Sequence, residues 1–177
     1  MSEIINELNL DTSSIGNLLK YFKLRDKGKR IDDRDEYFLL IALAVASRST
    51  CLRRNYGAVL VKNNKILSTG YNGAPSEHYH CIDKMECYRE MNNIPHGKQY
   101  EDCRSVHGEQ NALISANGND LKGSTLYLMG YDCNENKLIK SKPCKICEPM
   151  LQNAGIVKVI SAYEKDENLF FVKTSYI

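Results

Sequence analysis

The sequence predicts an α/β fold, a three-layer α/β/α sandwich built around a mixed sheet of about five strands. Strand-like and helix-like segments alternate along the chain, which is the first observation behind this prediction. The first two strand-like segments are separated by a two-residue turn, and the later ones by helical segments long enough to cross over a sheet. The 42% hydrophobic and 26% charged fractions of the 177 residues are those of a soluble globular protein.

Composition also suggests how the chain is organised. Residues 1–30 are polar and weakly periodic, and we interpret them as an N-terminal extension to a domain that spans residues 31–177. The start of the chain lacks a signal-peptide pattern, and the apolar run at 37–46 is too short to span a bilayer. We therefore expect a cytoplasmic protein with no membrane partner. The seven cysteines are an odd number without a secretory signal, which favours metal binding or catalysis over a disulfide framework.

The first half of the domain contains a helix and a hairpin. DEYFLLIALAVASRS (35–49) is acidic at its start and apolar around much of its circumference, which predicts a well-buried helix. GAVLVK (57–62), the turn NN and KILSTGY (65–71) predict a β-hairpin. Residues 72–105 form a long segment without a secondary-structure signal, which indicates a functional or cross-linked loop.

The second half alternates helices with strands. We expect helices at 107–117 and 144–154, and strands at 124–131, 156–163 and 168–177. Both of these helices follow a strand or a loop, so their first residues are expected to lie at one edge of the sheet. Side chains at the two helix starts can therefore meet.

Those helix starts carry the residues that indicate chemistry. His107, Cys144 and Cys147 are ligand types that suit zinc, and the two cysteines are one helical turn apart. A catalytic zinc takes three protein ligands and keeps a fourth position for water, which the metal makes nucleophilic near neutral pH. Glu109 is spaced to reach that water without binding the metal, and is predicted to transfer its protons. The order H-x-E…P-C-x-x-C is a signature of zinc nucleobase deaminases.

Other interpretations exist for each part of this pattern. The CxxC pair could be half of a structural zinc knuckle or a redox pair. The prolines on either side, Pro143 and Pro149, argue against the redox interpretation. A lone histidine such as His107 is more often a surface or core residue than a ligand. The combined pattern favours the deaminase.

Three blocks of the chain resemble the deoxycytidylate (dCMP) deaminase family of the cytidine-deaminase-like superfamily, which includes bacterial late-competence proteins. The first block, residues 49–81, contains TGYNGAP (69–75), which tRNA adenosine deaminases and small cytidine deaminases generally lack. The others are CRSVHGEQNAL (103–113) and PCKIC (143–147). The resemblance extends over residues 35–163 and implies a cytidine-deaminase-like fold.

The resemblance also implies roles for single residues. His107, Cys144 and Cys147 would bind catalytic zinc, and Glu109 would be the proton shuttle. Asn72 would contact the sugar and phosphate end of the nucleotide, although it also suits a turn in YNG. The backbone of Gly108 would contact the base; the family usually has alanine there, and glycine costs about 0.5–1 kcal/mol of helix stability. The segment 132–142 is longer than in compact members of the family.

A second metal site is also expected. Similar family members carry a structural zinc that involves the cysteines matching Cys51 and Cys81. The candidate ligands in this chain are Cys51, Cys81, Cys87 and Cys103. They could instead be independent buried thiols, or His78, His80 or His96 could replace one of them. Cys133 is interpreted as a spare thiol.

The function predicted from these features is zinc-dependent hydrolysis of dCMP to dUMP and ammonia, by a hydrolase that acts on a cyclic amidine. The alternatives are deamination of another cytosine or purine nucleotide or nucleoside, and a competence or DNA-uptake role. The expected partner is a small nucleotide whose phosphate is bound through Asn72 and Arg53 or Arg54, although the two arginines could instead be surface charges. The net charge of +2 argues against a nucleic-acid-binding module. The resemblance implies a homo-oligomer, a hexamer.

Overall fold

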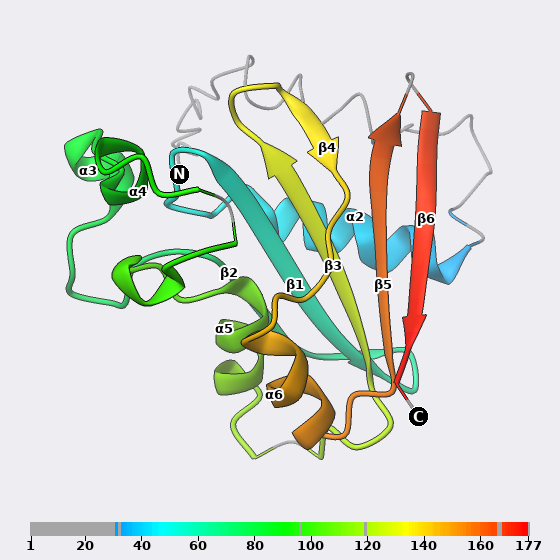
Figure 1. The fold of residues 1–177 in the computed structure, drawn as a ribbon. Coiled ribbons are helices and arrows are strands. Elements are labelled where there is room, and N and C mark those ends of the chain that lie inside the picture. Colours follow the sequence, from blue (N-terminus) through cyan, green and yellow to red (C-terminus); the bar gives the residue numbers. More distant parts are fainter. Residues whose placement is uncertain (1–30, 32, 96, 119, 166–167, 177) are drawn as a thin grey trace, which may run out of the picture.

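The computed structural model describes residues 31, 33–95, 97–118, 120–165 and 168–176, and its centre is a single mixed sheet (Figure 1). The strand order is β2-β1-β3-β5-β6, and the short β4 pairs with β3 beside this path. The strands are β1 (Arg54–Lys62), β2 (Lys65–Tyr71), β3 (Thr125–Asp132), β4 (Lys137–Ile139), β5 (Lys158–Lys165) and β6 (Asn168–Ser175). The five-strand path confirms the predicted sheet. The predicted extension at 1–30 lies outside the described residues.

Helices cover both faces of the sheet, as predicted for a three-layer sandwich (Figure 1). The helix α2 (Arg34–Ala46) packs on one face, and α5 (Gly108–Ser115) and α6 (Cys147–Asn153) pack on the other. Alternation along β1 divides the core, because successive side chains of a strand point to opposite faces. Val59 and Val61 join the cluster under α2, whereas Ala58 and Leu60 join the cluster under α5 and α6.

The hairpin of β1 and β2 turns where the sequence indicated. Asn63 and Asn64 both have positive φ, 51° and 61°, as a two-residue type I′ turn requires. Asparagine tolerates this conformation better than most residues, so the NN pair determines the turn. The two strands pair antiparallel, with Lys62 opposite Lys65.

The sheet is mixed because β3 pairs with neighbours of opposite direction on its two sides. The strand β3 runs antiparallel to β1 but parallel to β5, and α6 lies between β3 and β5 in the chain. The strand β6 then pairs antiparallel with β5. The strands expected at 124–131, 156–163 and 168–177 are therefore all present.

Two segments differ from the prediction. The long segment 72–105 contains three short helical turns, α3 (Cys81–Lys84), α4 (Tyr88–Met91) and η1 (Tyr100–Asp102), although no secondary structure was expected there. Backbone hydrogen bonds of 3.1 and 2.8 Å between Gly73 and Val106 pin its base. We call residues 74–95 and 97–105 the small lobe, and it projects beside the start of β1 and the end of β2 (Figure 1).

The second difference is in the segment 132–142, where β4 forms an unpredicted hairpin with β3. The carboxylate of Asp132 accepts hydrogen bonds from the backbone N–H groups of Asn134 and Glu135, which turns the chain back. Three residues are too few for a strand to show periodicity in the sequence. None of the helices in the described part of the chain has the length and hydropathy to cross a membrane.

Candidate metal centre and active site

The predicted metal ligands lie where two helices begin on the same face of the sheet. His107 directly precedes α5, Cys147 is the first residue of α6, and Cys144 lies just before that helix. Nδ1 of His107 lies 3.4 Å from Sγ of Cys144 and 3.4 Å from Sγ of Cys147. All three ligand atoms lie within 4.8 Å of one another. The fold therefore brings together two motifs that are far apart in the sequence.

Local hydrogen bonds hold each ligand in place. The backbone N–H of His107 donates to Oε1 of Gln110 at 3.0 Å, which stabilises the start of α5. The carbonyl of Cys144 accepts from the N–H of Glu148 at 2.9 Å, so helical bonding begins before the first residue of α6. This bond places Cys144 and Cys147 one turn apart, with both sulfurs toward His107. The predicted helix at 144–154 is therefore shorter by about one turn, but the spacing of the ligands is as expected.

The electrostatics of the two thiols differ. A hydrogen bond from Cys147, followed in size by the one from His107, lowers the pKa of Cys144 to about 3. The same hydrogen bond to Cys144, together with burial, raises the pKa of Cys147. The hydrogen bond with Cys144 also raises the pKa of His107. One thiolate is thus already present, and metal binding at neutral pH displaces the proton of Cys147.

Glu109 lies beside these ligands but outside their group. It occupies the first turn of α5, its residue is only 5% exposed, and burial raises the pKa of its carboxyl group. A hydrogen bond with Cys147 also contributes to its environment. No carboxylate oxygen belongs to the group of described ligand atoms within 4.8 Å, which is limited to His107, Cys144 and Cys147. The position suits a group that exchanges protons next to a metal without binding it.

One nitrogen and two sulfur donors are a ligand set that zinc accepts in tetrahedral geometry. Because three protein ligands leave a fourth position open, this set is typical of a catalytic rather than a structural zinc site. The donor chemistry, the proximity and the low pKa of Cys144 all fit a zinc ion.

Comparison with known proteins agrees with this geometry. Residues 32–163 match the family described as the cytidine and deoxycytidylate deaminase zinc-binding region. The chain belongs to this family. His107, Cys144 and Cys147 form its zinc site.

Several members of the deaminase family resemble the chain closely. The deoxycytidylate deaminase of Mycobacterium phage D29 is 38% identical over 133 residues, which are 72% of this chain and 93% of that protein. That of Saccharomyces cerevisiae is 32% identical over 168 residues, which are 90% of this chain and 50% of that protein. The chain thus spans nearly all of the phage relative but half of the yeast one.

Solved structures of the family share the fold. The apo crystal structure of dCMP deaminase from cyanophage S-TIM5 has 28% identity and a TM-score of 0.55, and the match covers 78% of this chain and 89% of that one. The structure of the same phage enzyme in complex with dCMP and dUMP has 28% identity and a TM-score of 0.52, with 74% and 82% coverage.

Gly108 has a packing reason in this family member. A Cβ atom at this position would lie 3.3 Å from the carbonyl oxygens of both Tyr56 and Gly70. The first turn of α5 thus lies directly against β1 and β2, and glycine relieves the contact. Gly70 permits the same close approach from β2, since a Cβ there would collide with the backbone of Gly108 and Ala112.

Asn72 is buried at the end of β2, and both ends of its side-chain amide are engaged. Its Oδ1 accepts from the N–H of Tyr56 at 2.7 Å, and its Nδ2 donates to the carbonyl of Arg54 at 2.9 Å. The side chain therefore fixes the backbone of β1 beside the zinc site. The amide still has a second N–H and a second lone pair with which it could bind a nucleotide. The contact of Asn72 with a nucleotide stays a prediction.

The other predicted ligands gather around the small lobe. Burial raises the pKa of Cys81, and electrostatic repulsion from Cys51, Cys87 and Cys103 adds to it, so these four thiols lie near one another. Cys133 joins their neighbourhood, since burial and then Cys51 raise its pKa to about 11. Among described residues, however, the criterion of mutual distances below 4.8 Å is met at the catalytic trio alone.

The structure adds partners of Arg54 that the sequence did not indicate. Nε of Arg54 lies 3.1 Å from Oδ2 of Asp132, and Arg54 also hydrogen-bonds the Tyr56 hydroxyl. Burial raises the pKa of Tyr56, whose phenol is within electrostatic range of Glu109. Because 78 positions separate Arg54 from Asp132 in the sequence, no local pattern pairs them.

Proposed function

We propose that the chain is a zinc-dependent deoxycytidylate deaminase that hydrolyses dCMP to dUMP and ammonia. The observation that carries this proposal is the buried carboxyl of Glu109 beside the His107, Cys144 and Cys147 ligand group, to which no carboxylate of the described residues belongs. A purely structural zinc site has no need of such a group. The names and similarity of the family relatives support dCMP as the substrate.

The proposed reaction assigns each residue a step. When bound, the zinc supplies the Lewis acidity that makes a water nucleophilic near neutral pH. Glu109 accepts a proton as the water oxygen attacks C4 of cytosine, and delivers it to N3 of the ring. The Glu109 carboxylate then accepts the proton of the new C4 hydroxyl and delivers it to the amino group as the C4–N bond breaks, so ammonia leaves and the C4 carbonyl of dUMP remains. Burial raises the pKa of Glu109, which favours a carboxyl able to both take and return protons.

The phosphate of dCMP requires a cation near the site. Arg54 is suited to this role because its side chain is 34% exposed and Asp132, 3.1 Å away, holds it in a fixed direction. Arginine offers several N–H donors in a planar fork, so one can bind Asp132 while others bind a phosphate.

A panel of nucleotides tests the substrate. Loss of cytosine absorbance is measured with dCMP, dCTP, deoxycytidine and cytidine, with the His107→Ala protein as the blank. We expect the highest kcat/KM for dCMP and a far lower value for deoxycytidine. Equal efficiency with dCMP and deoxycytidine would refute the nucleotide assignment, and turnover of a different base alone would assign another deaminase.

We also propose that Cys51, Cys81, Cys87 and Cys103 bind a second, structural zinc. The gathering of these cysteines supports this, because a metal that takes up thiolates removes the repulsion that raises the pKa of Cys81. Elemental analysis should find about two zinc ions per chain, and about one in Cys81→Ser. The matched control is Cys133→Ser, which should keep both. A single zinc in the intact protein, with Cys81 open to alkylation, would exclude this site.

Two further proposals concern organisation. The described residues from 33 to 176 contribute to one sheet and its helices, which supports a single deaminase domain at 31–177. The family resemblance favours a hexamer, and light scattering on the purified protein tests it. A monomer at micromolar concentration would exclude it.

A further inference from the structure

The small lobe contains a buried arginine that does not pair with a carboxylate among the described residues. Arg89 of α4 is only 5% exposed. Its guanidinium donates to three backbone carbonyls, those of Pro95 at 2.8 Å, Lys98 at 2.6 Å and Gln99 at 2.6 Å. Hydrogen bonds that involve a charged donor are among the stronger ones in proteins. Arg89 therefore fixes the backbone that leads into η1.

The last of the residues whose carbonyls Arg89 holds, Gln99, has a strained backbone conformation. Gln99 has φ of 48° and ψ of 51°, the left-handed region that residues with a side chain rarely adopt. Its carbonyl is one of the three that Arg89 holds. The strained residue sets the direction of the one that follows, Tyr100. The hydrogen bonds of Arg89 thus offset the conformational free energy of the left-handed Gln99, which orients Tyr100.

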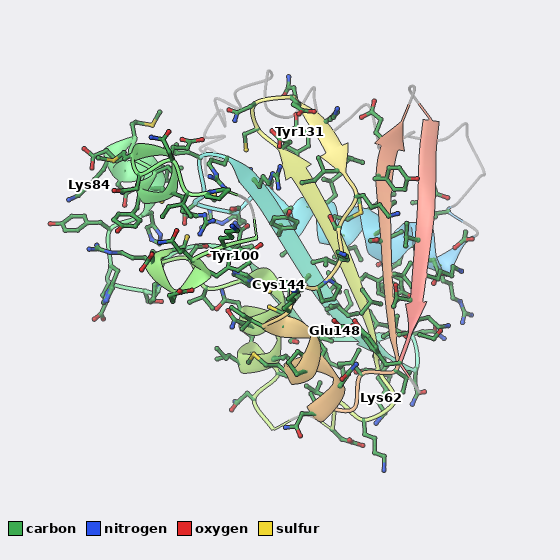
Figure 2. All side chains as sticks on the ribbon, viewed as in Figure 1. Lys62, Lys84, Tyr100, Tyr131, Cys144 and Glu148 are labelled. Atoms are coloured by element: carbon green, nitrogen blue, oxygen red, sulfur yellow. The ribbon has the colours of Figure 1, made fainter. Side chains whose placement is uncertain are left out.

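Tyr100 connects the small lobe to the zinc site. The Cζ atom of Arg89 lies 5.3 Å from the centroid of the Tyr100 ring. The Tyr100 ring in turn meets the imidazole of His107 edge to face, with centroids 5.4 Å apart and an interplanar angle of 79°. Figure 2 shows Tyr100 and Cys144 where the small lobe meets the start of α6. Arg89, Tyr100 and His107 therefore form a continuous stack from α4 to a metal ligand.

The surroundings of the His107 ring include the two sulfurs and the Tyr100 ring. Its Nδ1 faces the two sulfurs, which leaves Nε2 as the outer nitrogen. A metal-bound histidine almost always donates its outer N–H to a carboxylate, a carbonyl or water, and this bond fixes the ring. None of the hydrogen bonds among the described residues involves Nε2 of His107. The Tyr100 ring lies edge to face against this imidazole, where it limits the rotation of the ring.

We propose that Tyr100, aimed by Arg89, is the positioning residue of His107, so that the small lobe controls the geometry and affinity of the catalytic zinc site. The inference rests on the zinc site and not on the identity of the substrate. It assigns the lobe a role in the chemistry in addition to its own stability.

The test measures metal binding directly. Zinc affinity is determined by competition with a chelator, and the site geometry by the visible absorption of the cobalt-substituted protein. The cobalt spectrum of His107→Ala is subtracted to isolate the catalytic site. The variants are Tyr100→Leu, which removes the ring, Tyr100→Phe, which keeps it, and Arg89→Lys, which keeps the charge but loses the fork. Tyr88→Leu is the matched control, because Tyr88 is an exposed aromatic residue of the same lobe.

We expect Tyr100→Leu to weaken zinc binding at the catalytic site about 10- to 100-fold and to shift the cobalt bands. Arg89→Lys should also weaken zinc binding and shift the cobalt bands in the same direction. Tyr100→Phe should bind zinc as the parent does, because the edge-to-face contact is retained. This rescue separates positioning from a general loss of lobe structure.

The proposal is overturned if Tyr100→Leu keeps parental zinc affinity and cobalt bands, or if Tyr88→Leu loses them equally. Failure of the proposed function has a different signature, in which the parent protein binds zinc but does not deaminate dCMP. The two ideas can therefore fail independently.

Discussion

Replacing Glu109 with glutamine tests whether this residue moves protons. The amide keeps the shape of the side chain but cannot accept a proton and return it. General acid–base catalysis is typically worth about 10²–10⁴-fold. Glu109 is proposed to serve several transfers, and at 5% exposure bulk water does not replace it. We therefore expect a loss of about 10⁴-fold in kcat, which corresponds to about 5 kcal/mol.

Folding and metal content should change little in the same variant. Burial raises the pKa of Glu109, so the charged form is disfavoured in its site and a neutral amide is tolerated there. Because Glu109 is outside the group of zinc ligands, Glu109→Gln should keep its zinc. His107→Ala behaves differently, since it removes a ligand and should lose zinc and activity together.

The assay follows dCMP absorbance, zinc content and melting temperature on the same preparations. The matched control is Glu148→Gln, an exposed acidic residue near the start of α6 that should leave all three unchanged (Figure 2). Near-normal turnover of dCMP by Glu109→Gln would show that the proposed mechanism is wrong.

Three further predictions follow from other contacts. Arg54→Met should raise KM for dCMP about 10-fold or more, the value of a lost charged hydrogen bond, and leave deoxycytidine kinetics unchanged in a substrate comparison. Gly70→Ala should destabilise the fold by about 1–3 kcal/mol in urea unfolding, because the new Cβ collides with the backbone of α5. Burial acts to raise the pKa of Asp35, but hydrogen bonds from Lys173 and Tyr127 lower it below its ordinary 3.8. Asp35 therefore stabilises the folded state above pH 3.8, and this contribution is lost as the pH falls through the lower pKa of the folded state. In Asp35→Asn, the stability measured by circular dichroism should therefore decrease less steeply with falling pH.

Most of the sheet could be predicted because its signals are local. The asparagine pair between two β-branched runs specified the hairpin, and helical segments between the later strands specified the parallel pairing of β3 and β5. The short β4 and the helices of the small lobe could not be predicted. Helices of four residues have no measurable periodicity, and here hydrogen bonds from Arg89 and the bridge between Gly73 and Val106 stabilise them.

The candidate site divides in the same way. His107, Cys144 and Cys147 were predicted because each motif has a spacing that the chemistry of zinc requires. Tyr100 was not, since an aromatic residue seven positions before His107 matches no periodicity. Its contact depends on the path of the small lobe, which the left-handed Gln99 determines. Pairings made by tertiary structure are invisible to a pattern search along the chain.

The zinc site also has a topological consequence. His107 and Cys144 are 37 positions apart, so one metal ion joins the two ends of a loop that includes α5, β3 and β4. A cross-link around a loop of this length lowers the entropy of the unfolded chain by an amount worth about 4 kcal/mol. The same ion thus also cross-links the part of the fold that contains β3 and β4. Removal of zinc should therefore lower the free energy of unfolding as well as abolish activity.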